Sequence, residues 1–245
     1  MKEKIAISID SSLLSLIDSL SNSPRSQTIE SLLKQAMKKQ PISTAILLIH
    51  KNDQKHLLKQ IDSFPLIQHH FNFLTKNKIK QLYIITEPTS TIQTIIKELP
   101  KNIKTEIISE KTQQGTASAL SLLKTKIKHS FILINGDTFN DFSIQNMINE
   151  HLNSNKLITM GLISSQTPHK RGAVTLDGNS VIDFKEKQET PSNIINAGIY
   201  IIKPEIFSLL KNKKSLEKEI FPELAKQKQI QGFFTFGNFV HAPEF

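Results

Sequence analysis

The sequence predicts an α/β protein with three layers, preceded by a small helical part. Downstream of Pro41, short apolar runs bounded by turn residues alternate with stretches of helical periodicity, a pattern typical of a mainly parallel sheet covered by helices on both faces. Upstream of it lie one short alternating segment and two amphipathic helical stretches, followed by a polar join that proline interrupts. We therefore expect two domains, residues 1–40 and residues 44–245.

Composition narrows the class of protein. The 245 residues include no cysteine, which excludes disulfide frameworks and thiolate metal sites. No apolar run reaches the roughly 18 to 20 residues of a membrane span, and polar and acidic side chains interrupt the first twenty residues, unlike a secretory leader. We expect a cytoplasmic protein with no membrane partner. The 31 Lys and Arg against 22 Asp and Glu give a net charge of +9, which favours polyanionic partners or reflects a lysine-rich composition.

The first forty residues predict one strand and two helices. Residues 4–9 alternate, with three isoleucines on one face, as in a half-buried strand. Asp10 and Ser11 are favourable N-caps for a first helix, which ends before Pro24, and a second helix begins near Arg25. So short a segment buries too little apolar surface to be stable alone, and a single strand leaves an unpaired edge. Pairing with a second copy satisfies both requirements.

This arrangement, with its strand ending in Ile-Asp and its second helix opening on Pro-Arg-Ser-Gln-Thr-Ile, closely resembles the ribbon-helix-helix family of DNA-binding dimers over residues 1–40. In that family a two-stranded ribbon enters the major groove, and the N-terminus of the second helix holds a phosphate. The resemblance implies a homodimer bound to double-stranded DNA. The implied base-reading residues are Lys4, Ala6 and Ser8, and the implied phosphate-binding residues are Ser23, Arg25 and Ser26.

Three segments of the longer domain carry chemical information. A turn runs into a helix at residues 110–120, a buried strand at residues 131–137 ends on Gly-Asp, and residues 172–201 contain a Glu-Lys pair followed by an Asn-Ala-Gly strand. In this order and spacing they resemble the sugar-nucleotidyltransferase family over residues 44–240. The resemblance implies a three-layer α/β fold of the GT-A or Rossmann-like type.

The same resemblance implies a reaction and a set of residues. In the family, a sugar phosphate attacks the α-phosphorus of a nucleoside triphosphate and expels pyrophosphate, with Mg²⁺ neutralising charge. Asp137 would hold the Mg²⁺ and would be catalytic together with Lys55 if the site is active. The implied ligand sites are Gly115 and Thr116 for the nucleotide, and Gly172, Glu186, Lys187 and Asn196 for the sugar and its phosphate.

Two departures from the family pattern bear on activity. The family has a Gly-Gly-x-Gly-Thr-Arg loop after its first strand, whereas here that strand is followed by residues 50–54 (His-Lys-Asn-Asp-Gln), and no glycine precedes Gly115. The family usually has a second metal-binding aspartate where this sequence has His241, and imidazole is a poor ligand for Mg²⁺. Losing even one transition-state donor costs about 100- to 1,000-fold in rate. These departures predict a domain that binds ligands without turning them over.

Three hypotheses follow for function. The leading one is a DNA-binding transcriptional regulator, in which the degenerate domain senses a nucleotide or sugar-nucleotide ligand or provides an assembly surface. The first alternative is an active sugar-1-phosphate nucleotidyltransferase that uses the basic stretch of residues 50–55 in place of the glycine loop. The second is a structural homodimer without DNA binding. Pyrophosphate release that depends on Asp137 distinguishes the enzyme from the other two.

Overall fold

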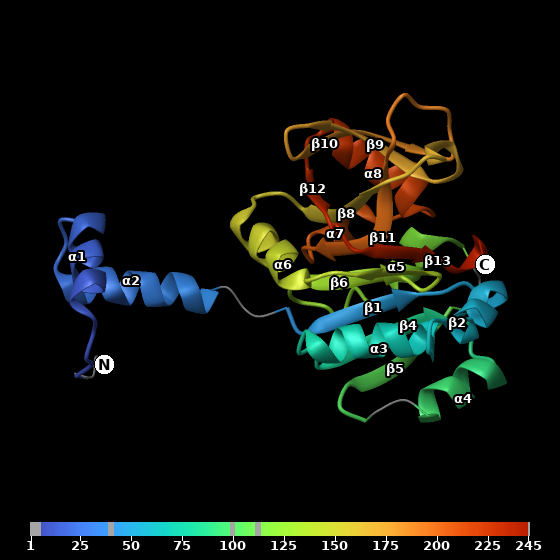
Figure 1. Cartoon of the computed structure of the whole chain (residues 1–245), viewed down its shortest axis with the longest axis horizontal. Coiled ribbons are helices and arrows are strands. Elements are labelled where there is room, and N and C mark those ends of the chain that lie inside the picture. Colours follow the sequence, from blue (N-terminus) through green and yellow to red (C-terminus); the bar gives the residue numbers. More distant parts are fainter. Residues whose placement is uncertain (1–5, 39–41, 99–100, 111–113, 245) are drawn as a thin grey trace. The chain divides into compact units, whose positions relative to one another are not determined.

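The chain forms two compact units, Met1–Pro41 and Ile42–Phe245 (Figure 1). The structure, a computed structural model, describes residues 6–38, 42–98, 101–110 and 114–244. Within these ranges, no helix combines the length and the apolar character needed to cross a membrane.

The first unit consists of α1 (Ser11–Leu20) and α2 (Arg25–Lys38), so both predicted helices are present. Asp10 caps α1 by accepting a hydrogen bond of 2.8 Å from the Ser12 amide. The guanidinium of Arg25 joins the two helices through two hydrogen bonds of 2.6 Å to the Asp18 carboxylate. Residues 6–9 do not form the predicted strand in this single chain and have no regular structure. A strand needs a hydrogen-bonded neighbour, and no described segment of this unit supplies one.

The second unit is built on a mixed sheet of nine strands in the order β5-β4-β1-β6-β11-β8-β12-β10-β9. Strands β5, β4, β1 and β6 are parallel, whereas β11 is antiparallel to both of its main neighbours, β6 and β8. The pairs β2–β3 and β7–β13 form two short separate ribbons. The strands are β1 (Thr44–Leu48), β2 (Gln60–Ile61), β3 (Phe64–Pro65), β4 (Gln81–Thr86), β5 (Lys104–Ser109), β6 (Phe131–Asn135), β7 (Thr138–Asp141), β8 (Ile158–Ser164), β9 (Gly172–Asp177), β10 (Ser180–Glu186), β11 (Ile194–Ile202), β12 (Ile230–Phe234) and β13 (Asn238–His241).

Helices cover both faces of this sheet (Figure 1). Alternate residues of β1 point to opposite faces: Ile46 and Leu48 pack in one core with residues of α5 and α8, and Ala45 and Leu47 in another with residues of α3 and α6. The predicted three-layer α/β class is therefore confirmed. The helical segments of this unit are η1 (Lys51–Leu58), α3 (Leu66–Lys76), α4 (Ser90–Glu98), α5 (Thr116–Ser121), α6 (Ile144–Asn153), η2 (Pro168–Lys170), α7 (Ile206–Leu209), η3 (Leu216–Ile220), α8 (Phe221–Lys226) and η4 (Ala242–Glu244).

Strand β11 connects the two halves of the sheet. One edge of β11 pairs with β8, and the other pairs with β6 over its C-terminal part and with β9 at Ile195. The register shifts between Asn196 and Tyr200, where Gly198 has φ +71°. A side chain at Gly198 would collide with the hydroxyl of Thr138, so only glycine suits this bend.

The carboxyl ends of β4, β1 and β6 meet at one edge of the sheet, because the three strands are parallel and adjacent. The chain leaves β1 after Leu48 and β6 after Asn135 at this edge. Open α/β sheets bind their ligands at such edges. A functional site is therefore expected here, beside Asp137.

Candidate active site

A cleft of about 210 Å³ opens at this edge of the sheet. It lies between the ends of β1 and β6 on one side and the N-terminus of α5 on the other. Three of the predicted site residues, Gly115, Thr116 and Asp137, line it together. The other lining residues are Leu48, Ile49, His50, Asp53, Ile85, Glu110, Ala119 and Asn135.

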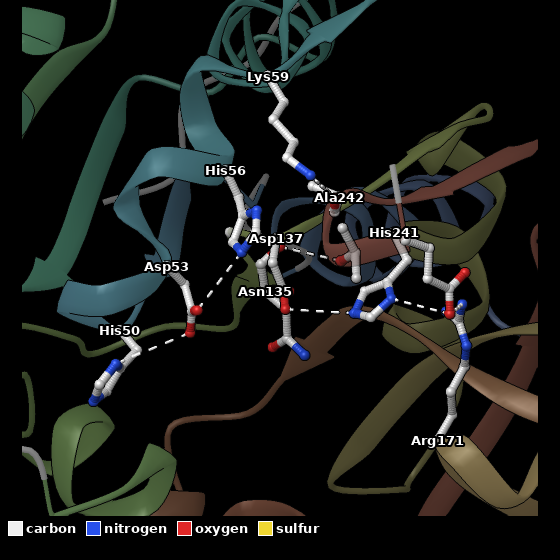
Figure 2. Close-up of polar contacts among 12 residues, drawn as sticks. His50, Asp53, His56, Lys59, Asn135, Asp137, Arg171, His241 and Ala242 are labelled. Atoms are coloured by element: carbon white, nitrogen blue, oxygen red, sulfur yellow. Dashed lines mark hydrogen bonds and ion pairs between the residues drawn. The ribbon is translucent and has the colours of Figure 1, made fainter.

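Asp137 lies opposite His241 because β7 and β13 pair as an antiparallel ribbon in which His241 is the register partner of Thr138. The Ala242 amide donates a hydrogen bond of 2.8 Å to the Asp137 carbonyl, which fixes the end of this ribbon. His241 Nε2 then lies 3.6 Å from Asp137 Oδ2 (Figure 2). This distance is too long for a hydrogen bond.

The second ring nitrogen of His241 faces a different acidic residue. Its Nδ1 atom is 3.4 Å from Glu244 Oε1, on the short helix η4 that follows β13. Glu244 is in turn paired with Arg171, whose Nη2 atom is 2.5 Å from the same oxygen. Burial raises the pKa of the Glu244 carboxyl, but the Arg171 guanidinium and His241 outweigh this effect and hold the pKa below its usual value. The imidazole is thus placed between two carboxylates.

The segment after β1 replaces the glycine-rich loop with a 3-10 helix, η1. Its N-cap is His50, whose Nδ1 atom accepts a hydrogen bond of 3.2 Å from the Asn52 amide. Gln54, which is buried, fastens the helix to the chain after β4 by donating hydrogen bonds to Thr86 Oγ1 (2.8 Å) and to the carbonyl of Glu87 (2.7 Å). Where the family pattern predicts a glycine-rich loop, this chain therefore forms a helical turn held by side-chain hydrogen bonds.

Two lysines of this region differ in position. Lys55, predicted to be catalytic, is exposed on η1. Lys59, at the C-cap of η1, reaches toward the β7–β13 ribbon and donates a hydrogen bond of 2.7 Å to the carbonyl of Ala242 (Figure 2). The structure therefore places Lys59 against the residue that follows His241, and it leaves Lys55 exposed.

The predicted nucleotide-binding residues lie at the start of α5. Gly115 has φ +106°, and a Cβ there would be 2.5 Å from the carbonyl oxygen of Lys214, so the position requires glycine. The Thr116 hydroxyl donates a hydrogen bond of 2.6 Å to Glu217 Oε2 and accepts one of 2.9 Å from the Leu216 amide. The N-terminus of α5 is thereby joined to the π-helix η3.

The predicted sugar-binding residues lie on β9, β10 and β11. Gly172 and Glu186 are register partners across β9 and β10, and a Cβ on Gly172 would be 3.0 Å from Glu186 Oε2. Lys187 has φ +51°, and its amide donates a hydrogen bond of 2.9 Å to the Arg171 carbonyl. The side-chain amide of Asn196 donates to the hydroxyl of Tyr200, which is fully buried. Three strands therefore hold this set of side chains.

Glu186 occupies an unusual electrostatic position. Burial raises the pKa of its carboxyl, and the nearby carboxylate of Glu217 raises it further, while Lys187 and Lys218 act in the opposite direction. Burial, together with Glu217, also raises the pKa of the Tyr200 hydroxyl. Glu217 in turn accepts a hydrogen bond from Thr116, which lines the cleft, so these perturbed groups are connected to it through one side chain.

The residues predicted to bind DNA belong to the other unit. Lys4 lies outside the described residues, and Ala6 and Ser8 are exposed in a segment without strand structure. Ser23 and Ser26 are exposed near the start of α2. Arg25 donates two hydrogen bonds to Asp18, and these hold the pKa of the Asp18 carboxyl below its usual value. These positions form no paired ribbon in the described part of the unit.

Several residues of the site were not predicted from the sequence. They are Lys59, Arg171, Tyr200, Glu217 and Glu244, all of which contact a predicted position or belong to the same network. For Glu217 a signal was present, because it lies in residues 215–222, within the range 44–240 over which the sequence resembles the family. For the others, only the three-dimensional arrangement reveals the contact.

The metal expected from the family is Mg²⁺, which nucleotidyltransferases commonly use. Asp137 supplies a carboxylate suited to it, but the facing donor is the imidazole of His241. Across the described ranges, no three His, Cys, Asp or Glu side chains are grouped to hold a metal. Mg²⁺ prefers oxygen ligands in octahedral geometry. The donor set at this position therefore does not fit a magnesium site formed by two carboxylates.

Comparison with curated proteins finds a guanylyltransferase subunit and a bifunctional protein among the relatives. The chain is 33% identical to the mannose-1-phosphate guanylyltransferase catalytic subunit beta of Drosophila melanogaster over 175 residues, 68% of this chain and 47% of that protein. It is 28% identical to the bifunctional protein GlmU of Methanococcus aeolicus over 197 residues, 77% of this chain and 46% of that protein. The chain thus spans about half the length of these relatives.

Comparison with solved structures supports the fold. The crystal structure of HddC from Yersinia pseudotuberculosis complexed with GMP-PN has a TM-score of 0.68 and 22% sequence identity, and the match covers 82% of this chain and 94% of that one. At this identity the likeness concerns the fold alone.

These comparisons correct the functional interpretation made from the sequence. The prediction of a DNA-binding regulator with a degenerate body is wrong, because the chain matches a nucleotidyl transferase family and is similar to a mannose-1-phosphate guanylyltransferase subunit. Nothing in the comparisons supports a ribbon-helix-helix segment. The sequence profile of the family described as nucleotidyl transferase matches residues 28–239, a range that begins inside α2 and extends to β13. This chain belongs to the nucleotidyl transferase family.

Proposed function

We propose that this chain is a sugar-1-phosphate nucleotidyltransferase with a rearranged triphosphate site. The observation that carries the proposal is the cleft at the carboxyl edge of β1 and β6, which Gly115, Thr116 and Asp137 line together. It lies within the region that matches the family. The names of the relatives suggest mannose 1-phosphate and GTP as the first substrates to test.

In the proposed reaction, a phosphate oxygen of the sugar 1-phosphate attacks the α-phosphorus of the nucleoside triphosphate. The new phosphorus–oxygen bond forms as the bond to the bridging β-phosphate oxygen breaks, and that oxygen leaves with its electron pair as pyrophosphate. The protein needs to supply alignment and neutralisation of negative charge rather than a covalent intermediate.

The sugar side of the proposed site is formed by the strands. Glu186 accepts hydrogen bonds from sugar hydroxyl groups, for which it must be ionised. Gly172 leaves room next to that carboxylate, since a Cβ there would lie 3.0 Å from Glu186 Oε2. Asn196 is held by Tyr200 on β11, and Lys187 neutralises the phosphate of the sugar.

The triphosphate side is formed by η1 in place of the glycine-rich loop. Lys51 and Lys55 on η1, and Lys59 at its C-cap, supply positive charge along this side. Lys51 is also paired with Glu87 at 2.6 Å, next to the contacts that fasten Gln54. Charge from lysine side chains can neutralise phosphate oxygens where backbone amides are missing.

The experiment measures pyrophosphate release from pairs of nucleoside triphosphates and sugar 1-phosphates, starting with GTP and mannose 1-phosphate. We expect turnover by the natural chain and a loss of at least about 1,000-fold in Asp137→Asn, because the carboxylate that stabilises charge at the reacting phosphates is removed. The matched control is Asp141→Asn, four residues along the same ribbon and exposed, which should keep full activity.

Two results would contradict the proposal. One is the absence of pyrophosphate release from every pair, together with no measurable binding of nucleotide by calorimetry. The other is turnover that Asp137→Asn and Asp141→Asn reduce equally, because the activity would then not come from this cleft.

We also propose that residues 6–38 pair with the same segment of a second chain. The observation is that most large apolar side chains of this unit are exposed, including Leu16 at 61% and Leu20 at 64%, and that Ile17 is the buried one among those described. A unit of this size needs a partner to complete its core. A second copy presents the same leucines, so the two faces are complementary by symmetry.

Light scattering coupled to gel filtration tests this pairing on the full chain. We expect a dimer for the natural chain, a monomer for Leu16→Glu combined with Leu20→Glu, and a dimer for the control Ser15→Glu on the same helix. A monomeric natural chain at micromolar concentration would overturn the pairing and leave the proposed enzymatic function untouched.

A further inference from the structure

The pair of Asp137 and His241 presents one carboxylate oxygen and one imidazole nitrogen, a donor set that suits magnesium poorly. We infer that it binds a divalent cation of the manganese, cobalt or zinc class, through Asp137 Oδ2 and His241 Nε2. The inference rests on the proposed function, since it assigns the metal of that same cleft. It is argued from the spacing of the two donors, their chemistry and the groups behind them.

The spacing suits an ion better than a direct contact. The two atoms are 3.6 Å apart, beyond hydrogen-bonding distance, although Asp137 immediately precedes β7 and His241 ends the β13 strand that pairs with it. Metal–ligand distances to imidazole nitrogen and carboxylate oxygen are about 2.0–2.2 Å. An ion at that distance from both donors therefore fits slightly off the line that joins them.

The chemistry of the donors selects the class of ion. One donor is a carboxylate oxygen and the other an imidazole nitrogen, and imidazole favours first-row transition metals and zinc over magnesium. The side chains are 30% and 24% exposed, respectively, so water and nucleotide oxygens have access to complete the coordination. With two protein donors, such a site depends on the phosphates of the nucleotide for its remaining ligands.

The groups behind His241 prepare the ring for this role. A ligating histidine usually has a carboxylate or carbonyl near its second nitrogen, which fixes the tautomer and raises the basicity of the ligating nitrogen. Here Glu244 Oε1 lies 3.4 Å from His241 Nδ1, an otherwise unpartnered buried atom, and Arg171 holds Glu244 from the other side. With Nδ1 facing Glu244, Nε2 is the nitrogen that faces Asp137.

The main experiment is pulsed electron paramagnetic resonance on the full chain with Mn²⁺, with and without GTP. We expect electron spin-echo modulation from a directly bound ¹⁴N nucleus in the natural chain. His241→Asp should keep Mn²⁺ but lose this modulation, and His241→Gln gives a second variant in case the first disturbs folding. His169→Asp removes an exposed histidine on η2 and should leave the modulation unchanged.

A competition titration adds a second measure. The natural chain should prefer Mn²⁺ over Mg²⁺, and His241→Asp should shift the preference toward Mg²⁺. Glu244→Gln keeps both ligands but should weaken Mn²⁺ binding by about tenfold, because it removes the carboxylate behind the ring.

The outcomes separate this inference from the proposed function. Bound Mn²⁺ without ¹⁴N modulation, in a chain that still releases pyrophosphate, would overturn the inference alone and indicate that His241 acts as a cation without a metal. Equal affinity for Mg²⁺ and Mn²⁺ in the natural chain and in His241→Asp would also overturn it. Failure to bind Mn²⁺–GTP and to release pyrophosphate would overturn the proposed function as well.

Discussion

The two sides of the cleft are held in place by different kinds of structure. On the proposed sugar side, Gly172, Glu186 and Asn196 lie on three strands of the sheet, and Asn196 donates a hydrogen bond to the fully buried Tyr200. On the triphosphate side, a single 3-10 helix, η1, carries the polar groups and is fastened mainly through Gln54. The proposed sugar side therefore depends on a few side chains held by the sheet, whereas the proposed triphosphate side depends on one helical turn, which buried Gln54 and Leu57 fasten and which carries exposed lysines.

The largest effect that would sharpen this comparison is expected at Glu186. Glu186→Ala should lower kcat/KM for the sugar phosphate by about 100-fold, since a hydrogen bond to a charged group is worth about 1.5–3 kcal/mol. Steady-state kinetics with the sugar phosphate varied provides the measurement. Asp177→Ala, which removes an exposed carboxylate of β9, is the control and should have no effect. An equal KM for the sugar phosphate in both variants would show that the sugar side is not formed by β10.

Gln54→Ala tests the fastening of η1. The substitution leaves buried partners on Thr86 and Glu87 unsatisfied, so we expect a loss of about 2 kcal/mol in the free energy of unfolding. Urea denaturation measures this loss, and Gln60→Ala, at an exposed position just after η1, is the control. The variant should also raise KM for the nucleotide more than KM for the sugar phosphate. A larger change on the sugar side would break the comparison.

A smaller effect concerns pH. The folded-state pKa of Glu186 is raised by burial and by Glu217, so the folded chain holds this proton more tightly than the unfolded chain. The corresponding stabilisation is complete below the unfolded value of 4.5 and is lost as the pH rises through the folded pKa. Glu217→Gln removes the like charge and lowers that pKa. The acid limb of the pH profile of kcat/KM for the sugar phosphate should therefore move to lower pH.

The control for this shift is Glu219→Gln, two residues away in η3 and not among the groups that raise the Glu186 pKa. An acid limb that stays in place in Glu217→Gln would mean that ionisation of Glu186 does not limit sugar binding.

The smallest effect is expected at Lys51. Its ion pair with Glu87 is exposed, so Lys51→Ala should change the free energy of unfolding by less than about 1 kcal/mol. Because the lysine supplies charge on the triphosphate side, KM for the nucleotide should rise severalfold while KM for the sugar phosphate stays constant. An unchanged KM for the nucleotide in Lys51→Ala and in Lys55→Ala would show that η1 does not replace the glycine loop.

The layered fold could be predicted from the sequence because it follows from periodicity. The strands now seen as β1, β6 and β11 are apolar runs with turn residues at their ends, and the helices between them have apolar stripes. Residues 6–9 alternate as a strand does but have no regular structure in the single chain, since alternation states only that one face is apolar. Whether such a segment forms a strand depends on a partner that the pattern cannot show.

The site was predicted only as far as it follows the family pattern. Asp137 was predicted from the Gly-Asp that ends a buried strand and Glu186 from the Glu-Lys pair, and in the structure Asp137 lines the cleft. The helical turn of η1 determines which lysine reaches the Ala242 carbonyl, and this lysine is Lys59 rather than Lys55. The spacing of the two lysines in the sequence does not reveal this. Glu217 and Glu186 are 31 positions apart, and their proximity results from packing of η3 against the sheet.

The position of β11 has a consequence for how the second unit opens. This strand is hydrogen-bonded along both edges, and at Gly198 its backbone bends so close to Thr138 that no side chain fits. Its backbone amides can exchange with deuterated solvent only when both halves of the sheet separate, so they should be among the slowest to exchange. The ends of β5 and β9, which lie at the margins of the sheet, should exchange long before them.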